Sequence, residues 1–207
     1  MYSEIIKRFL DILFSIILMP LILIIIIVCA IAIKIEDQGS VFYAALRLGK
    51  DEKTYKMYKL RTMKENAPDL RNEDGSTYNS DKDVRVTKVG SFLRKTSIDE
   101  IPQIINVLLG NMSFIGPRPD LPEHILQYSD SEIKKLKVLP GITGYNQAYY
   151  RNTIQWKERL INDVYYVNNI SFMFDLKILL KTISTILLRK GVFIESDNKN
   201  TEGGKNE

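Results

Sequence analysis

The sequence predicts an α/β protein made of an N-terminal membrane helix, residues 1–36, and a small mixed domain, residues 37–194. Three observations predict it: a long apolar run near the N-terminus, an alternating stretch typical of a β-hairpin, and later stretches with helical periodicity. The remaining residues, 195–207, are polar and are expected to form a disordered tail.

The N-terminal segment is apolar over a length that suits a bilayer. Every residue from Ile12 to Ile33 except Ser15 is apolar, and at about 1.5 Å per residue the run reaches roughly 33 Å. Pro20 removes a backbone hydrogen bond, so a kink is expected there. Basic residues flank both ends, so the positive-inside rule does not choose an orientation. A spanning helix and a re-entrant helix, which leaves by the face it entered, both fit these residues.

The domain begins with a predicted β-hairpin over residues 40–63. Two runs, SVFYAALRLG and TYKMYKLRTM, flank the polar turn KDEK. Within the second run, from Tyr55 to Leu60, aromatic or apolar residues alternate with Lys, as in a half-buried strand. Residues 64–83 have almost no apolar content and predict a lid or a disordered loop. Apolar periodicity returns over residues 84–95.

Helical patterns follow in four segments, separated by stiff or tight loops. They cover residues 99–109, ended by Gly110, and residues 121–138, 153–168 and 171–189. A short strand and a stiff turn are predicted in NMSFIGPRPD, and a tight loop in PGITG, residues 140–144. The last helical segment is apolar but carries Asp175, Lys177 and Lys181, which suits an amphipathic helix in a membrane interface or a core helix.

Composition narrows the chemistry. The net charge of +4 suits a protein near anionic lipid or phosphates. The sequence contains no pattern of aromatic and basic residues typical of RNA- or DNA-binding motifs, so no nucleic-acid partner is expected. A single cysteine, Cys29, excludes a disulfide or a Cys-based zinc site within one chain. The single histidine, His124, has no G-x-S-x-G motif beside it, so acid–base chemistry is expected to rest on carboxylates.

The stretch SIDEIPQ, residues 97–103, places Asp99 and Glu100 side by side. Ser97 and Glu100 fit a capping box, but that register puts Pro102 where its ring meets the preceding turn. A helix that starts at Asp99 tolerates Pro102, so we expect Asp99 near the N-cap with its pKa lowered by the helix dipole. The acids then fit either a capping role or a reacting carboxylate that binds Mg²⁺ or attacks phosphorus.

Several cations accompany these acids. In GPRP, the prolines on both sides of Arg118 stiffen the backbone, so the segment fits either a held guanidinium that binds phosphate or a surface turn with a solvated Arg. Other basic residues fit either an anion site or a solvated face: Lys59, Arg61, Arg85, Lys88, Arg94 and Lys95. Gln147, Arg151 and Asn152 in GYNQAYYRN fit a polar pocket or turn chemistry. No Walker A and no G-x-G-x-x-G sequence occurs.

The order and spacing of these motifs resemble the bacterial sugar transferases, the monotopic phosphoglycosyl transferases. The motifs are YKLRTM, FLRKTSIDEIPQIINVLLGNMSFIGPRP, LPGITG, RN…W…R and DVYYVNNISFMFDLKI. The resemblance runs from about Lys7 to about Leu188 and looks like the minimal form of the family. It implies an enzyme that moves a phosphosugar from a UDP-sugar to polyprenyl (undecaprenyl) phosphate and releases UMP. This is the first membrane step of a bacterial glycan such as capsule, O-antigen or a glycoprotein glycan.

The resemblance also implies roles for residues. Asp99 would be the nucleophile that forms a covalent phosphosugar intermediate, Glu100 would assist it, and Mg²⁺ would bind the diphosphate with Asp99 as a ligand. Arg118 would contact a phosphate or the nucleotide. Further substrate-binding candidates are Lys59, Arg61, Arg94, Gln147, Arg151 and Asp175. The family implies a re-entrant helix kinked at Pro20, in the bacterial inner membrane, with the domain on the cytoplasmic face.

Three departures from the family pattern stand out. Met19 replaces Ser before the helix-breaking proline, Ala45 replaces Gln in Q-x-R-x-G, and Tyr150 replaces the Gly before R-N. Tyr150 would reshape the pocket, so the sugar is not assigned. The competing functions are a non-catalytic membrane scaffold that recruits glycan enzymes and a membrane phosphohydrolase. Expected partners besides the substrates and membrane lipid are a second copy of the chain or downstream glycosyltransferases.

Overall fold

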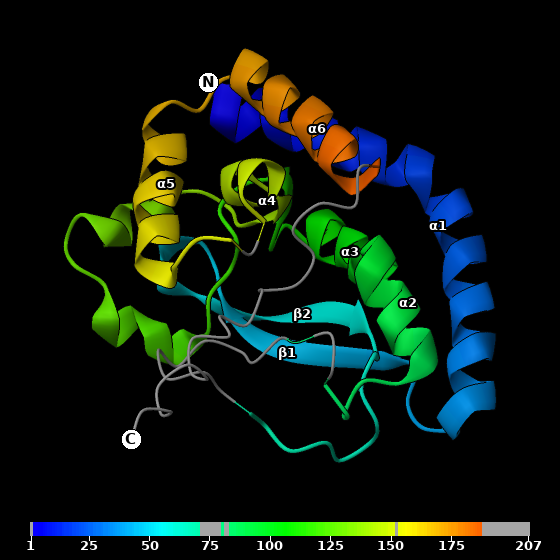
Figure 1. The fold of residues 1–207 in the computed structure, drawn as a ribbon. Helices are drawn as coiled ribbons and strands as arrows, with labels where there is room; N and C mark the ends of the chain where they lie inside the picture. The colour runs from blue at the N-terminus through cyan, green and yellow to red at the C-terminus, as the bar shows by residue number, and fades with distance from the viewer. Residues whose placement is uncertain (1, 71–79, 81–82, 152, 188–207) are drawn as a thin grey trace, which may run out of the picture.

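A computed structural model describes residues 2–70, 80, 83–151 and 153–187 (Figure 1). Its α-helices are α1 (Lys7–Asp37), α2 (Lys88–Thr96), α3 (Gln103–Leu108), α4 (Tyr145–Tyr149), α5 (Trp156–Asn168) and α6 (Phe172–Leu187). Its strands are β1 (Phe42–Leu48), β2 (Thr54–Leu60), β3 (Ser113–Ile115) and β4 (Gly141–Thr143). A π-helical turn, Tyr2–Ile6, leads into α1, and 3-10 helices cover Lys50–Glu52, Ile98–Glu100, Pro122–Gln127 and Glu132–Lys137. The predicted tail 195–207 and most of the predicted loop 64–83 lie outside the described residues.

The predicted hairpin is confirmed. β1 and β2 pair antiparallel, with Phe42 opposite Leu60. Because side chains alternate along strands, one hairpin face carries Tyr43, Ala45, Arg47, Tyr55, Met57 and Lys59. Met57 packs in a core with Val107 of α3, so this face of the hairpin turns toward the rest of the domain.

A second pair of strands is parallel and joins β3 to β4, with Ser113 opposite Gly141. The backbones approach so closely that a Cβ on Gly141 would lie 2.1 Å from the Gly116 nitrogen, so only glycine fits there. The tight loop predicted over residues 140–144 is therefore largely strand β4. The Gly141 N–H donates to the Pro117 carbonyl oxygen at 2.9 Å, which fixes the start of the Pro-Arg-Pro segment.

The helix predicted over residues 99–109 forms in two pieces and does not begin at Asp99, so that prediction is wrong. Ser97 ends α2 with a left-handed φ of 58°, and its side chain makes no capping hydrogen bond. A 3-10 turn, Ile98–Glu100, comes next, and α3 begins immediately after Pro102. The ring of Pro102 opposes a helical turn before it, which explains the break.

The remaining helix predictions hold in large part. α5 and α6 occupy the segments 153–168 and 171–189, and Gly110 follows α3 with a φ of +83°, as expected for a helix end. Residues 121–138 form two 3-10 helices in place of an α-helix.

Among the described residues, the segment Tyr2–Asp37 is the one helix long and apolar enough to cross a membrane. Only 11% of its most apolar stretch is buried, and its exposed side chains include Phe14, Ile17, Leu21, Ile24 and Ile31. Figure 1 shows α1 beside α6 at first and then changing direction to run along α2; Pro20 lies within this helix. The chain thus combines an apolar helix, consistent with a membrane anchor, with a small α/β domain.

Both ends of α1 contact the α/β domain. Near the start of α1, Lys7 forms an ion pair with Asp175 of α6. At its end, Asp37 forms an ion pair with Arg61, which follows β2. The second half of α1 joins a core made of Ile26, Cys29, Ile33, Leu60 and Leu93.

Candidate active site

A cleft of about 1250 Å³ is lined by the hairpin face, the turn Ile98–Glu100, the Pro-Arg-Pro segment and residues of α4 and α5. The predicted site residues that line it are Lys59, Arg61, Arg94, Asp99, Glu100, Arg118, Gln147 and Arg151. The fold therefore gathers both acids and most of the predicted cations around one space, although they come from distant parts of the sequence; Lys88 and Lys95 do not line it.

Glu100 is held by two cations. Its Oε1 atom accepts a hydrogen bond from Lys59 Nζ at 2.6 Å and another from Arg118 Nη2 at 3.1 Å. Lys59 comes from β2 and Arg118 from the Pro-Arg-Pro segment, so this carboxylate joins three parts of the site. Burial alone would raise the pKa of Glu100, but Lys59 and Arg118 lower it to about 2. Glu100 is therefore ionised and fixed in place.

Asp99 differs from its neighbour. It is only 9% exposed, and no described residue donates a hydrogen bond to its carboxylate. Burial raises the pKa of Asp99 to about 6; Lys59 opposes this shift and the charge of Glu100 adds to it. The predicted lowering of this pKa is wrong, because burial raises it and because Asp99 lies in a 3-10 turn and not at the start of an α-helix. The carboxylate remains available to a ligand in the cleft.

Further cations surround the acids. Arg94 donates from Nε to Thr62 Oγ1 at 2.9 Å. Burial lowers the pKa of Arg94, and the nearby charge of Asp99 opposes that shift. Burial also lowers the pKa of Arg151, opposed by the charge of Glu100. Both guanidiniums thus lie within electrostatic reach of the acid pair.

Two predicted residues have other contacts. Arg61 lines the cleft, but its guanidinium pairs with Asp37 and donates to the Ser40 carbonyl oxygen, so it ties the end of α1 to the hairpin. The structure does not bring Asp175 into the lining of this cleft. Asp175 pairs with Lys7 and accepts a hydrogen bond from Tyr166 Oη at 2.7 Å, which gives it a role in holding α1.

Gln147 lines the cleft from α4. Its Nε2 and Oε1 atoms are both buried, and neither finds a hydrogen-bond partner among the described residues. Buried amides are rarely left unpaired, because each missing bond costs free energy. Of the two roles that the sequence left open, the position of Gln147 in the cleft lining favours a polar pocket, and its unpaired amide is placed to bond a polar ligand.

Sequence reasoning missed a buried ion cluster beneath Arg118. The Nζ atom of Lys135 lies 2.7 Å from Asp120 Oδ2 and 2.8 Å from Asp163 Oδ2, and it donates to the Arg118 carbonyl oxygen at 3.2 Å. Burial would lower the pKa of Lys135, but the two carboxylates raise it. The charged ammonium thus fixes the backbone of the Pro-Arg-Pro segment.

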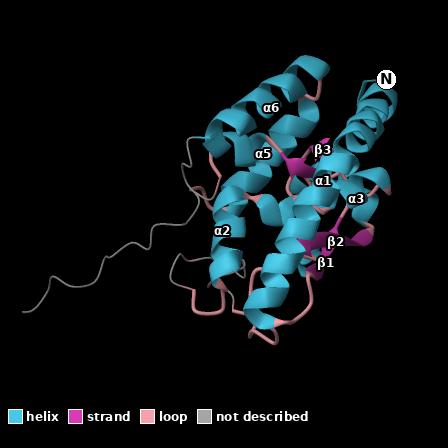
Figure 2. Cartoon of the chain, turned by 90° about the vertical axis from the view of Figure 1, so that its right-hand side faces the viewer, coloured by secondary structure: helices cyan, strands magenta, loops and turns pink. Residues whose placement is uncertain are grey.

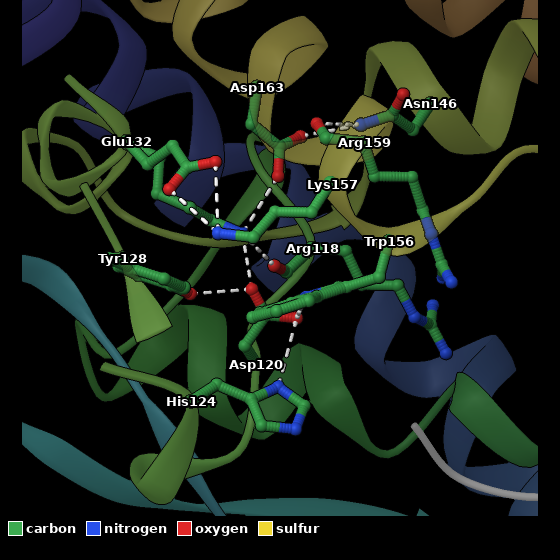
Figure 3. Close-up of polar contacts among 11 residues, drawn as sticks. Arg118, Asp120, His124, Tyr128, Glu132, Asn146, Trp156, Lys157, Arg159 and Asp163 are labelled. Atoms are coloured by element: carbon green, nitrogen blue, oxygen red, sulfur yellow. Dashed lines mark hydrogen bonds and ion pairs between the residues drawn. The ribbon is translucent and has the colours of Figure 1, made fainter. Parts of the chain in front are cut away.

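More contacts support this cluster, and Figure 3 shows His124, Tyr128 and Trp156 gathered around Asp120. Tyr128 Oη donates to Asp120 Oδ2 at 2.6 Å, and Trp156 Nε1 donates to Asp120 Oδ1 at 3.3 Å. Asn146 of α4 donates to Asp163 at 2.8 Å. The sequence offered a weak signal, since EIKKLK presents three lysines and only the fold decides which is buried.

We expect Lys135→Met to destabilise the folded protein. Removing the ammonium leaves Asp120 and Asp163 buried without a counter-charge, so the free energy of unfolding should fall by about 3 kcal/mol. Thermal unfolding of the purified protein measures this loss. Lys134→Met, which changes an exposed neighbour, is the matched control and should leave the melting temperature unchanged. Equal stability of the two variants would contradict the cluster's role.

The side chains of the site also indicate how Mg²⁺ could be bound. The described residues contain no group of three or more His, Cys, Asp or Glu side chains that could hold a metal. Mg²⁺ is often bound through one or two carboxylates with substrate phosphates supplying further ligands. The uncommitted carboxylate of Asp99 fits that mode, because Glu100 is already occupied by Lys59 and Arg118.

The family model described as bacterial sugar transferase matches residues 2–189. An uncharacterized sugar transferase of Bacillus subtilis is 38% identical over 188 residues, which cover 91% of this chain and 90% of that protein. The UDP-N-acetylgalactosamine-undecaprenyl-phosphate N-acetylgalactosaminephosphotransferase of Aeromonas hydrophila is 39% identical over 189 residues, 88% of this chain and 44% of that protein. The UDP-glucose:undecaprenyl-phosphate glucose-1-phosphate transferase of Escherichia coli is 36% identical over 199 residues, 92% of this chain and 42% of that protein.

The extent of these matches differs between relatives. The chain spans most of the Bacillus protein but less than half of the Aeromonas and Escherichia proteins. The family model matches nearly the whole chain, including the residues from several motifs of the resemblance that line the cleft. This protein belongs to the bacterial sugar transferase family.

Proposed function

We propose that this protein transfers a sugar phosphate from a UDP-sugar to polyprenyl phosphate through a covalent intermediate on Asp99, and that it releases UMP. The contrast within the acid pair carries the proposal: Glu100 is clamped by two cations, whereas Asp99 is buried in the cleft wall and uncommitted. The names of the Aeromonas and Escherichia relatives support the substrate class.

Two displacements at the same phosphorus account for the reaction. A carboxylate oxygen of Asp99 attacks the phosphorus that carries the sugar, and the bond from this phosphorus to the UMP oxygen breaks. A phosphate oxygen of polyprenyl phosphate then attacks the aspartyl phosphosugar, and the bond to Asp99 breaks. The product is a polyprenyl diphosphate sugar, and Asp99 regains its carboxylate. A covalent intermediate lets one site serve a soluble donor and a lipid acceptor in turn.

The cations have matching tasks. Arg118 is paired with Glu100 and partly exposed in the cleft, so it suits the negative charge that develops on the departing UMP. Lys59 keeps Glu100 ionised, and Glu100 in turn orients Lys59 and Arg118 beside the reacting phosphorus. Bound Mg²⁺, held by Asp99 and the diphosphate, would supply charge neutralisation.

The test is UMP release from a panel of UDP-sugars with Mg²⁺, with and without polyprenyl phosphate. The transferase predicts turnover with one or more donors only when the lipid phosphate is present. Steady UMP production without the lipid would indicate a hydrolase. No UMP from any donor would favour a non-catalytic scaffold.

The raised pKa of Asp99 predicts an acidic limb in the pH profile. The nucleophile must be ionised, so kcat/KM should fall as pH drops through about 6, where Asp99 takes up a proton. Glu100→Gln removes a negative charge that raises this pKa, so the limb should move to lower pH in that variant. Rates measured from pH 4.5 to 8 test this, and a profile with no acidic limb would contradict it.

We further propose that α1 is re-entrant, with a bend at Pro20, and that α6 lies in the membrane interface. The contacts at both ends of α1 support re-entry, because a spanning helix would carry one end away from the domain to the opposite face. Exposed apolar side chains support an interfacial α6: Phe172, Met173, Leu179, Leu180 and Ile183. UDP-sugars are cytoplasmic, so the domain would face the cytoplasm at the inner membrane.

Cysteine labelling tests the topology. In a Cys29→Ala background, Ser3→Cys before α1 and Lys53→Cys in the hairpin turn should both react with a membrane-impermeant reagent from the same side. We expect labelling in inside-out vesicles and protection in intact spheroplasts. Labelling of Ser3→Cys in intact spheroplasts would show that α1 spans the membrane.

A further inference from the structure

The C-terminal end of α1 holds the beginning of α2. Glu36 Oε1 accepts a hydrogen bond from the backbone N–H of Lys88 at 2.7 Å, and Glu36 Oε2 accepts one from Val89 at 2.9 Å. The first N–H groups of a helix have no partner within the helix, and a carboxylate there is also favoured by the helix dipole. A residue of the apolar helix therefore completes the N-terminus of α2.

The N-terminal end of α1 holds the end of α3. Arg8 donates from Nη2 to the Leu108 carbonyl oxygen at 3.0 Å and from Nη1 to the Val107 carbonyl oxygen at 2.5 Å. The last carbonyls of a helix also lack partners within the helix, and a cation there complements its dipole. The opposite ends of α1 thus bind the opposite ends of α2 and α3.

Between those two anchored ends lies the acid pair. α2 runs into Ser97, the turn Ile98–Glu100 follows, and α3 begins after Pro102. In the view of Figure 2, α1 passes in front, with α2 to one side of it and α3 to the other, and α1 contacts both helices. Because rigid secondary elements can carry coupling between sites, a shift of either anchor is expected to move the turn that joins α2 to α3 and carries Asp99.

We propose that Arg8 and Glu36 are positioning residues of the active site, which make the geometry of Asp99 and Glu100 depend on the shape that α1 takes in a lipid surface. The inference rests on the proposed transferase function, because turnover is one of its readouts. The bend of α1 sets the distance between the two anchors, so a lipid environment that holds α1 in its bent form would also hold the turn in its reactive form.

The alternative is that Glu36 only caps α2, and the chain offers a control for it. Thr87 caps the same helix from within its own segment, since its Oγ1 accepts from the Gly90 N–H at 2.9 Å. Thr87→Val removes a cap of α2 without touching α1. Glu4→Gln changes an exposed acid at the other end of the same helical segment.

The experiment compares Glu36→Gln, Arg8→Met, Thr87→Val and Glu4→Gln in nanodiscs of phosphatidylcholine and phosphatidylglycerol. We expect Glu36→Gln and Arg8→Met to lower kcat about tenfold with KM for the UDP-sugar within about twofold, because misplaced reacting groups lose rate more than binding. The two controls should stay within about twofold of the unmodified protein. Equal loss in Thr87→Val and Glu36→Gln, or no loss in Glu36→Gln, would overturn the inference.

Hydrogen exchange supplies a readout that does not depend on turnover. Amides of the turn Ile98–Glu100 should exchange faster in Glu36→Gln and Arg8→Met than in Thr87→Val or the unmodified protein. Unchanged exchange at this turn in both anchor variants would refute the coupling. If the unmodified protein makes no UMP, the proposed function fails, whereas this exchange comparison still decides the inference.

Discussion

Asp99→Asn is expected to reduce turnover by at least about 10⁴-fold, the scale seen when a covalent nucleophile is removed from an enzyme. The amide keeps the size of the carboxyl group but cannot attack phosphorus. The folded protein should tolerate the change, because burial already disfavours the charged form of Asp99 and raises its pKa to about 6. Steady-state UMP release measures the loss, and thermal unfolding checks that the fold is intact.

Two further variants sharpen this prediction. Asp51→Asn, in the exposed turn between β1 and β2, is the matched control and should keep full activity. Glu100→Gln keeps the nucleophile but loses the carboxylate that holds Lys59 and Arg118, so we expect a smaller loss of about 10²-fold. A larger loss in Glu100→Gln than in Asp99→Asn would reverse the roles that we assign to the two acids.

Arg118→Met is expected to lower kcat by about 10³-fold, within the range measured for arginines that stabilise phosphoryl transfer. The loss should be greater in kcat than in KM, because the charge on the departing phosphate grows in the transition state. Arg118→Lys should restore only part of the rate, since lysine lacks the planar, bidentate guanidinium.

The control for Arg118 is a cation on the hairpin face that does not carry Lys59. Lys56→Met removes an exposed cation there and should leave kcat unchanged. A rise in KM alone for Arg118→Met, with kcat preserved, would show that Arg118 binds substrate and transition state equally. Arg118 would then be a binding residue without a role in the chemical step.

Local sequence patterns predicted the hairpin and marked the Pro-Arg-Pro segment, because neighbouring residues determine both features. The alternation from Tyr55 to Leu60 predicted the hairpin, and Arg118, singled out in sequence by its flanking prolines, lines the same cleft as the two acids. The start of the helix near Asp99 was predicted wrongly, because the choice between a 3-10 turn and an α-helix at Pro102 depends on how α2 ends.

Contacts between residues distant in the sequence could not be predicted from the residues around them. The Lys7–Asp175 ion pair joins residues 168 positions apart, and nothing in the apolar segment 171–189 marks this acid as a partner of α1. The same holds for Lys135, which resembles its exposed neighbours in sequence but is buried between Asp120 and Asp163. The raised pKa of Asp99 likewise follows from burial, which the sequence around it does not specify.

The covalent intermediate on Asp99 can be detected by mass spectrometry of the protein quenched with UDP-sugar and Mg²⁺ in the absence of polyprenyl phosphate. We expect about one UMP released per active site and a mass increase of one sugar phosphate on the peptide that contains Asp99. Adding polyprenyl phosphate should discharge this adduct, and Asp99→Asn should never form it. Lipid-dependent turnover with no adduct on Asp99, or with an adduct on another residue, would show that Asp99 is not the nucleophile.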